Sequence, residues 1–70
     1  MATDSVYKVI ELVGVSSESW EEATRTAIAT ASKTLRDLRV GEVIKFDVTI
    51  EDGKVALFRS RLSVSFKYED

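Results

Sequence analysis

The side chains that could do chemistry in this chain are carboxylates and cations, because it contains twelve acidic and ten basic residues but no histidine and no cysteine. Relays of the Ser-His-Asp and Cys-His kind therefore cannot be built within one chain, which removes most nucleophilic catalysis. A structural zinc site lacks its usual thiolate and imidazole ligands for the same reason. No pair of carboxylates stands out at a spacing typical of acid–base catalysis. The composition predicts a binding or assembly protein, not an enzyme.

The acidic residues are scattered along the sequence and do not have the spacing of a calcium-binding loop. They include Asp4, Glu11, Glu18, Glu21, Glu22, Asp47, Glu51 and Asp52. The net charge is −2, whereas a nucleic-acid-binding face needs clustered Lys and Arg in excess of acids. The sequence also lacks a long apolar run of the kind that spans a membrane. Neither nucleic acid nor membrane is therefore expected as a partner.

The clearest polar pattern lies on two strands predicted over 43–51 and 55–68, joined at an Asp52-Gly53 pair that favours a tight hairpin. One face of the first strand is apolar and carries Ile44, Phe46, Val48 and Ile50, opposite Val43, Lys45, Asp47, Thr49 and Glu51. The buried parity of the second strand is Ala56, Phe58, Ser60, Leu62, Val64, Phe66 and Tyr68. Across the hairpin the polar faces meet as a ladder of Lys45, Asp47, Thr49, Arg59 and Arg61. Such a ladder is ordinary solvated surface unless subunits pack on it.

The second strand of this hairpin is also unusually long, at about 14 residues where roughly 5–6 are typical. A long strand left open at the edge of a sheet invites pairing with another chain. Such an edge is either blunted by charged side chains, for which Arg59, Arg61 and Lys67 are available, or used in assembly, and the small core argues for assembly.

A further strand is predicted from Val6 to Val13, because this run is rich in β-branched and aromatic residues and ends at Gly14. Both of its faces are apolar: Val6, Ile10 and Leu12 on one, Tyr7, Val9 and Val13 on the other. A strand of this kind is usually covered on both sides. Since the chain has one helix to offer, the second cover is expected to come from a neighbouring subunit.

A helix is predicted to begin near Ser19, which stands in the Ser-x-x-Glu relation of a capping box with Glu22. Its apolar stripe recurs at steps of three and four and comprises Trp20, Thr24, Ala27, Ile28, Ala31, Leu35 and Leu38. Gly41 is the first backbone breaker and is taken as the end of the helical stretch. The alanines allow close approach, so the helix should lie in the curve of the sheet. Trp20 is interpreted as core or interface packing.

The length of 70 residues permits one domain, spanning 1–70, whose hydrophobic core is too small to stabilise the fold well by itself. A single core of this size supplies only roughly 3–5 kcal/mol, and small proteins usually add disulfides, a metal or other subunits. Oligomerisation is the support that remains here. The first five residues lack the basic and apolar segments of a signal peptide, so a cytoplasmic location is expected.

These residues resemble the dodecins, small flavin-binding proteins with a strand-helix-strand-strand fold that form hollow spherical homododecamers. The resemblance is carried by residues 6–14 (VYKVIELVG), 19–23 (SWEEA), 42–44 (EVI) and 62–66 (LSVSF), and it covers nearly the whole chain. It implies an α+β fold, with a three-stranded antiparallel sheet wrapped around one helix. It also implies that the chief partner is the chain itself, and that the function is non-catalytic storage or binding of a small molecule.

The flavin site implied by the resemblance is altered in this sequence. Flavin-binding dodecins stack a tryptophan, placed just before the second strand, on the isoalloxazine ring, and a glutamine of the third strand hydrogen-bonds its polar edge. The matching positions here are Val40 and Arg59, and Lys45 matches a position near the ribityl chain. Valine offers no aromatic face, and arginine donates hydrogen bonds without accepting them. Binding of riboflavin or FMN is therefore doubtful, and Arg59 with Lys45 could receive an anionic group instead.

An alternative follows from the segment Leu38-Arg39-Val40. It resembles a subgroup of dodecin-like proteins that lack the flavin residues and for which calcium binding has been described. The second hypothesis is therefore a flavin-independent dodecameric shell that binds calcium or another ion, with metal ligands that no motif in this sequence identifies.

Overall fold

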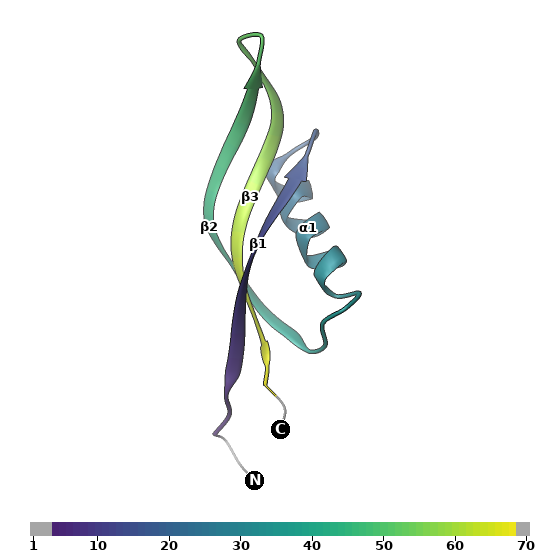
Figure 1. The fold of residues 1–70 in the computed structure, drawn as a ribbon, viewed down its shortest axis with the longest axis vertical. Helices are drawn as coiled ribbons and strands as arrows, with labels where there is room; N and C mark the ends of the chain where they lie inside the picture. Colours follow the sequence, from purple (N-terminus) through teal and green to yellow (C-terminus); the bar gives the residue numbers. More distant parts are fainter. Residues whose placement is uncertain (1–3, 69–70) are drawn as a thin grey trace.

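The computed structural model describes residues 4–68, so the part of the N-terminal prediction that concerns residues 1–3 lies outside it. The elements follow in the predicted order: β1 (Tyr7–Ser16), α1 (Trp20–Ala31), β2 (Leu38–Glu51) and β3 (Lys54–Lys67). Figure 1 shows α1 beside one face of a twisted sheet, with the β2–β3 hairpin projecting beyond the helix. The predicted α+β class with one helix and three antiparallel strands is confirmed.

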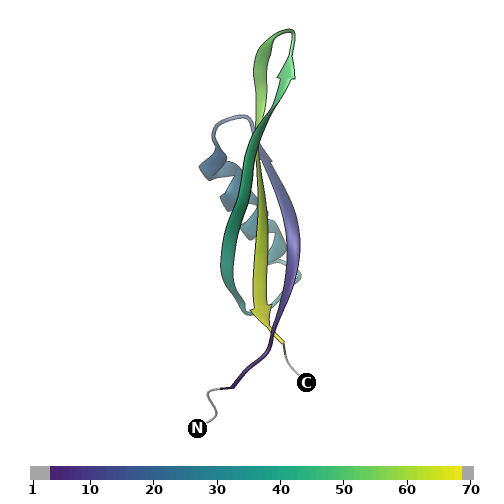
Figure 2. The same ribbon diagram turned by 90° about the vertical axis from the view of Figure 1, so that its left-hand side faces the viewer.

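The central strand of the sheet is β3, because the strand order is β1-β3-β2 and both pairings are antiparallel. The prediction that this long strand forms an open edge is therefore wrong. Its length serves two partners at once: β1 pairs with it from Ser16 to Tyr7, and β2 pairs with it over almost its whole length. The strands with one unpaired side in this sheet are β1 and β2, which flank β3 in Figure 2.

Gly14 lies inside β1, opposite Ser60 of β3, so its predicted role as the end of the strand is also wrong. It is buried. A Cβ atom at this position would overlap the backbone carbonyl oxygen of Ala23 and contact the side chain of Ala27. The glycine is required because helix and strand approach each other here at backbone distance.

The helix begins as predicted, with Ser19 as its N-cap and the Ser19 hydroxyl accepting a hydrogen bond from the backbone N–H of Glu22 at 3.0 Å. Its buried residues are Ala23, Ala27 and Ala31. The helix ends much earlier than predicted, at Ala31, with Ser32 as C-cap. Asp37 then adopts a left-handed backbone conformation (φ 57°), and the chain enters β2 at Leu38. Gly41 and the preceding three residues therefore belong to a strand.

The tight β2–β3 turn is confirmed, with positive φ at both Asp52 (52°) and Gly53 (75°). The alternation on β2 is interrupted by an irregularity between Val43 and Lys45. Val43 pairs with the buried Leu62 and so lies on the helix side of the sheet, contrary to the prediction that it faces away with Lys45. From Lys45 to Thr49 the predicted alternation holds, since Phe46 pairs with Ser60 on the helix side and Asp47 with Arg59 on the other, before a further irregularity between Thr49 and Ile50.

The core between sheet and helix is small. Its buried apolar residues are Ala23, Ala27, Ala31, Leu62 and Val64. The buried Ser60 hydroxyl is satisfied by the hydroxyl of Thr24 at 2.8 Å. Among residues 4–68, thirteen large apolar residues remain exposed: Val6, Tyr7, Val9, Val13, Val15, Trp20, Val40, Val43, Ile44, Phe46, Ile50, Val55 and Tyr68. Within the described part of the chain, no helix has the length and apolar character needed to cross a membrane.

Candidate functional site

The three predicted site residues lie on β2 and β3, and their register places them along one face of the sheet. Val40 is opposite Ser65, Lys45 opposite Arg61, and Arg59 opposite Asp47. These β3 partners share the parity that points away from α1, because the intervening Ser60, Leu62 and Val64 are buried beneath it. Val40 lies inside β2 and not just before it, which corrects the predicted placement.

Val40 is nevertheless far from the other two within one chain. Its β3 partner is six residues from Arg59, a distance of roughly 20 Å along a strand. The register shift between Leu38 and Val40 also brings Val40 to the border of a cavity of about 250 Å³ on the helix side, lined by residues of α1, β2 and β3, to which neither Lys45 nor Arg59 contributes. A single chain therefore does not assemble the predicted site, and a ligand touching all three positions would need residues from a second copy.

Arg59 is already engaged by an acid. Its Nε donates to Oδ1 of Asp47 at 2.8 Å and its Nη2 donates to Oδ2 at 3.3 Å, so both carboxylate oxygens are used. The two side chains remain 37% and 36% exposed. The hydrogen bond from Arg59 is the main cause of a lowered pKa of Asp47; burial opposes it, and the positive charges of Arg59, Lys45 and Arg61 add to the lowering. The same pair raises the pKa of Arg59.

The backbone of Asp47 is fixed from the other side of the sheet by Trp20. The indole Nε1 donates a hydrogen bond to the Asp47 carbonyl oxygen at 3.0 Å. The Trp20 ring stacks on Phe46 with centroids 5.4 Å apart and meets Phe58 edge to face at 5.1 Å. The interpretation of Trp20 as packing is confirmed, and the contacts tie the first turn of α1 to both strands of the hairpin.

A second ion pair lies on the outer face of the sheet, which is the face that points away from α1 and also carries Asp47 and Arg59. Nη1 of Arg61 lies 3.5 Å from Oε1 of Glu11, across the β1–β3 pairing. The outer face thus alternates basic and acidic side chains over all three strands: Glu11 on β1, Arg59 and Arg61 on β3, Lys45 and Asp47 on β2. The predicted ladder is confirmed, and both of its arginines have acidic partners.

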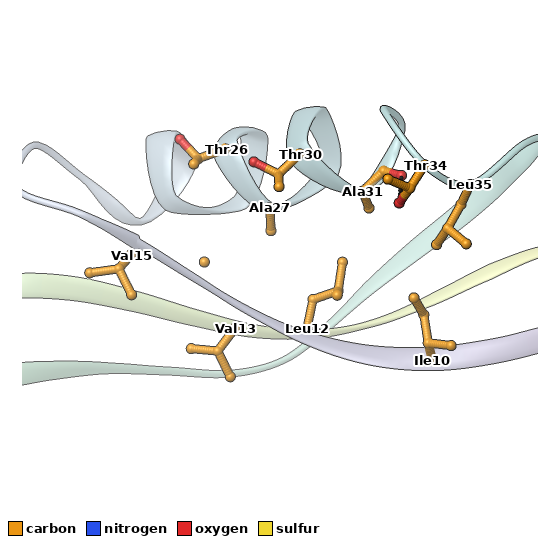
Figure 3. Close-up of a pocket in the computed structure, with 11 residues that line it drawn as sticks. Ile10, Leu12, Val13, Val15, Thr26, Ala27, Thr30, Ala31, Thr34 and Leu35 are labelled. Carbon is orange, nitrogen blue, oxygen red and sulfur yellow. Dashed lines mark hydrogen bonds between the residues drawn. The ribbon is translucent and has the colours of Figure 1, made fainter.

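An apolar groove runs between β1 and α1 on the other face of the sheet. Figure 3 shows Ile10 and Leu12 on the strand side and the threonines of α1 and the following turn on the helix side. The groove has a volume of about 590 Å³ and its lining is mainly apolar, with Thr26, Thr30 and Thr34 as the hydroxyl-bearing residues. It offers surface to pack against but no acid, base or nucleophile beyond hydroxyl groups.

The acids are not arranged as a metal site within one chain. Among residues 4–68, no group of three or more carboxylate side chains comes together in a way that could hold an ion. This agrees with the scattered spacing of the acids in the sequence. The residue that sequence reasoning left without a role is Asp47: it belonged to the ladder, but only the β2–β3 register showed that it faces Arg59.

Comparison with known proteins gives one consistent result. The family model described as Dodecin matches residues 6–69. Calcium dodecin of Mycobacterium tuberculosis is 41% identical over 63 residues, covering 90% of this chain and 89% of that protein. Dodecin of Thermus thermophilus is 43% identical over 65 residues, covering 93% of this chain and 94% of that protein.

Solved structures agree with these relatives. The structure of dodecin from Streptomyces coelicolor matches with a TM-score of 0.92 at 38% identity, covering 99% of both chains. The crystal structure of calcium dodecin from Mycobacterium tuberculosis, described as having a novel calcium-binding site, matches with a TM-score of 0.82 at 42% identity over 93% of both chains.

Proposed function

Because this chain belongs to the dodecin family, we propose that it assembles with copies of itself into a hollow homododecamer that binds a small ligand without catalysing a reaction. The observation that carries the assembly is the imbalance between core and surface. In the part of the chain that the structure describes, five apolar residues are buried, whereas thirteen large ones are exposed. A soluble monomer rarely exposes apolar surface on this scale, so other copies must cover it.

The positions of the exposed residues support coverage by the same chain. On β1, the outer-face residues Val9, Val13 and Val15 are open although α1 covers the opposite face at Ile10 and Leu12. The strand therefore has the two apolar faces predicted from sequence, with one cover supplied by the chain. The groove beside α1 adds a further apolar surface. Assembly of identical chains would bury both.

The ligand that we propose is a divalent cation such as calcium in preference to flavin. Val40 provides no ring for stacking and Arg59 already has an acidic partner in Asp47, which supports the sequence-based doubt about riboflavin and FMN. A relative that is 41% identical is a calcium dodecin. Since one chain does not gather three acidic ligands among its described residues, carboxylates of more than one copy would have to hold the ion.

Two measurements test this function. Light scattering should give a particle of twelve times the 7.8 kDa chain, and a stable monomer would contradict the proposed assembly. Titration calorimetry with calcium on chelator-stripped protein should give a saturable heat, and an absent heat would reject the ion. A flavin arm completes the test: riboflavin should keep its full fluorescence when mixed with the protein.

The flavin prediction has a matched positive variant. Restoring both family residues, Val40→Trp with Arg59→Gln, should create fluorescence quenching if the positions correspond as proposed. We also propose that the protein has no enzymatic activity, which the recovery of unchanged ligand after incubation would test. A cytoplasmic location is a further proposal, which cell fractionation would test.

A further inference from the structure

Among the basic side chains of the outer face in the described structure, Arg59 has the most hydrogen bonds to an acid. Arg59 and Asp47 are directly opposite in the β2–β3 register, and their two hydrogen bonds match the fork of the guanidinium to both carboxylate oxygens. The Glu11–Arg61 pair on the same face has a single contact at 3.5 Å. The two pairs therefore differ in geometry although they have the same charges.

Asp47 is also held in place by its backbone. Its carbonyl oxygen accepts the indole hydrogen bond of Trp20, and the neighbouring Phe46 stacks on that indole. The carboxylate does not have to be brought to Arg59 from a mobile loop, because it stands on a paired strand whose position α1 fixes. The Asp47 carboxylate thus already occupies the position in which an external phosphate or carboxylate would bind the guanidinium of Arg59.

We propose that Asp47 determines the charge of the ligand that the outer face accepts, by occupying Arg59 as an internal anion. An incoming anion would have to displace the seated carboxylate and would meet its negative charge within a few ångströms. With Asp47 neutralised, Lys45, Arg59 and Arg61 leave three basic groups on adjacent positions of β2 and β3, and the acids that remain on this face, Glu11 and Glu42, both lie opposite Ser63 at the Arg61 end of the cluster. The same face then becomes a site for a phosphate-bearing ligand.

This proposal deepens the proposed function, because it explains why the position that the family resemblance assigns to a ligand edge would reject anions here. It differs from the sequence-based hypothesis that Arg59 with Lys45 could receive an anionic group, and the test below separates the two. The pair geometry supports it independently of any flavin: what it predicts is a response to anionic charge, whatever the rest of the ligand.

The test compares Asp47→Asn with Glu11→Gln, using calorimetric titration of the assembled protein with inorganic pyrophosphate at low salt. Both changes remove one negative charge per chain from the same face. We expect pyrophosphate to bind Asp47→Asn at least tenfold more tightly than the wild type, with little gain for Glu11→Gln. The double variant Asp47→Asn with Arg59→Gln should lose the gain.

Several results would overturn the proposal. One is an equal gain for both single variants, since that would be an effect of net charge alone; another is an assembled Asp47→Asn that binds no better than wild type. If Asp47→Asn does not assemble, Asp47→Ser takes its place. The wild type gives an independent check: saturable pyrophosphate binding that Arg59→Gln abolishes would show that Asp47 does not block the arginine. Calcium binding and particle mass are measured separately, so failure here leaves the proposed function standing.

Discussion

Gly14 of β1 and Ala23 of α1 meet backbone to backbone, so that a Cβ atom on the glycine would overlap the carbonyl oxygen of the alanine. Helix and sheet are thereby held closer than any residue with a side chain at position 14 would allow. The three buried alanines of α1 extend this close contact along the helix. The whole helix–sheet packing depends on small residues.

Replacing Gly14 with alanine should destabilise the chain by about 3 kcal/mol, because the obstacle is backbone and cannot rotate away. The matched control is Gly41→Ala. Its added Cβ would be 3.4 Å and 3.6 Å from the ends of the Ile28 and Leu62 side chains, and we expect a change within about 0.5 kcal/mol. Urea unfolding followed by circular dichroism measures both, and equal effects would disprove the role of the close contact.

Replacing Trp20 with phenylalanine should cost about 1 kcal/mol, because it keeps a ring beside Phe46 and Phe58 but removes the hydrogen bond to the Asp47 carbonyl. Unfolding should be followed by circular dichroism, because Trp20 is the sole tryptophan of the chain and the variant therefore has no tryptophan fluorescence. Tyr7→Phe, which deletes a polar atom from another exposed aromatic residue, serves as control. A Trp20→Phe variant as stable as wild type would contradict the role of the indole N–H.

The folded chain should become less stable at acid pH, in part because Asp47 is protonated there. Arg59 lowers the pKa of this carboxyl in the folded chain, whereas the pKa of an aspartate in an unfolded chain is about 3.9. The contribution is therefore fully present above about pH 4 and is lost as the pH falls through the lower folded pKa. The melting temperature of wild type minus that of Asp47→Asn should be constant from neutral pH to about pH 5 and shrink below about pH 4. A difference that persists to pH 2 would refute this.

Introducing a charge at Val9 should block assembly. Val9 is 58% exposed in the single chain and pairs with Ser65 on the outer face, so Val9→Glu disturbs surface that only other copies would cover. Light scattering should show a shift to smaller particles. Ala29→Glu places the same charge on the exposed face of α1 and should assemble normally. Assembly of Val9→Glu at full size would show that this face of β1 is not buried by partners.

The element order could be predicted from local signals because each has a short-range cause. Ser19 with Glu22 marks the start of α1, and Asp52-Gly53 supplies the positive φ values of the hairpin. The helix end could not be found this way. Leu35 and Leu38 continue the helical spacing, but pairing of Leu38 with Phe66 in the sheet overrides the local pattern.

The site was less predictable than the fold because it depends on strand register. Asp47 and Arg59 are twelve residues apart in sequence, and their polarity alone placed them on one ladder without making them partners. The bulge after Val43 shifts the earlier part of β2 relative to this ladder, which alternation cannot reveal. The sequence predicts a strand end at Gly14 for a similar reason: a glycine required by a close contact looks the same in sequence as one that terminates a strand.

The small core has a thermodynamic consequence for any measurement on this protein. Among residues 4–68, the buried apolar side chains are three alanines, one leucine and one valine, so most of the apolar surface can leave water only through contact between copies. Folding and association are then one equilibrium, and the unfolding free energy depends on protein concentration. The melting temperature would therefore rise with protein concentration, and a value measured at one concentration would not be a property of the sequence alone.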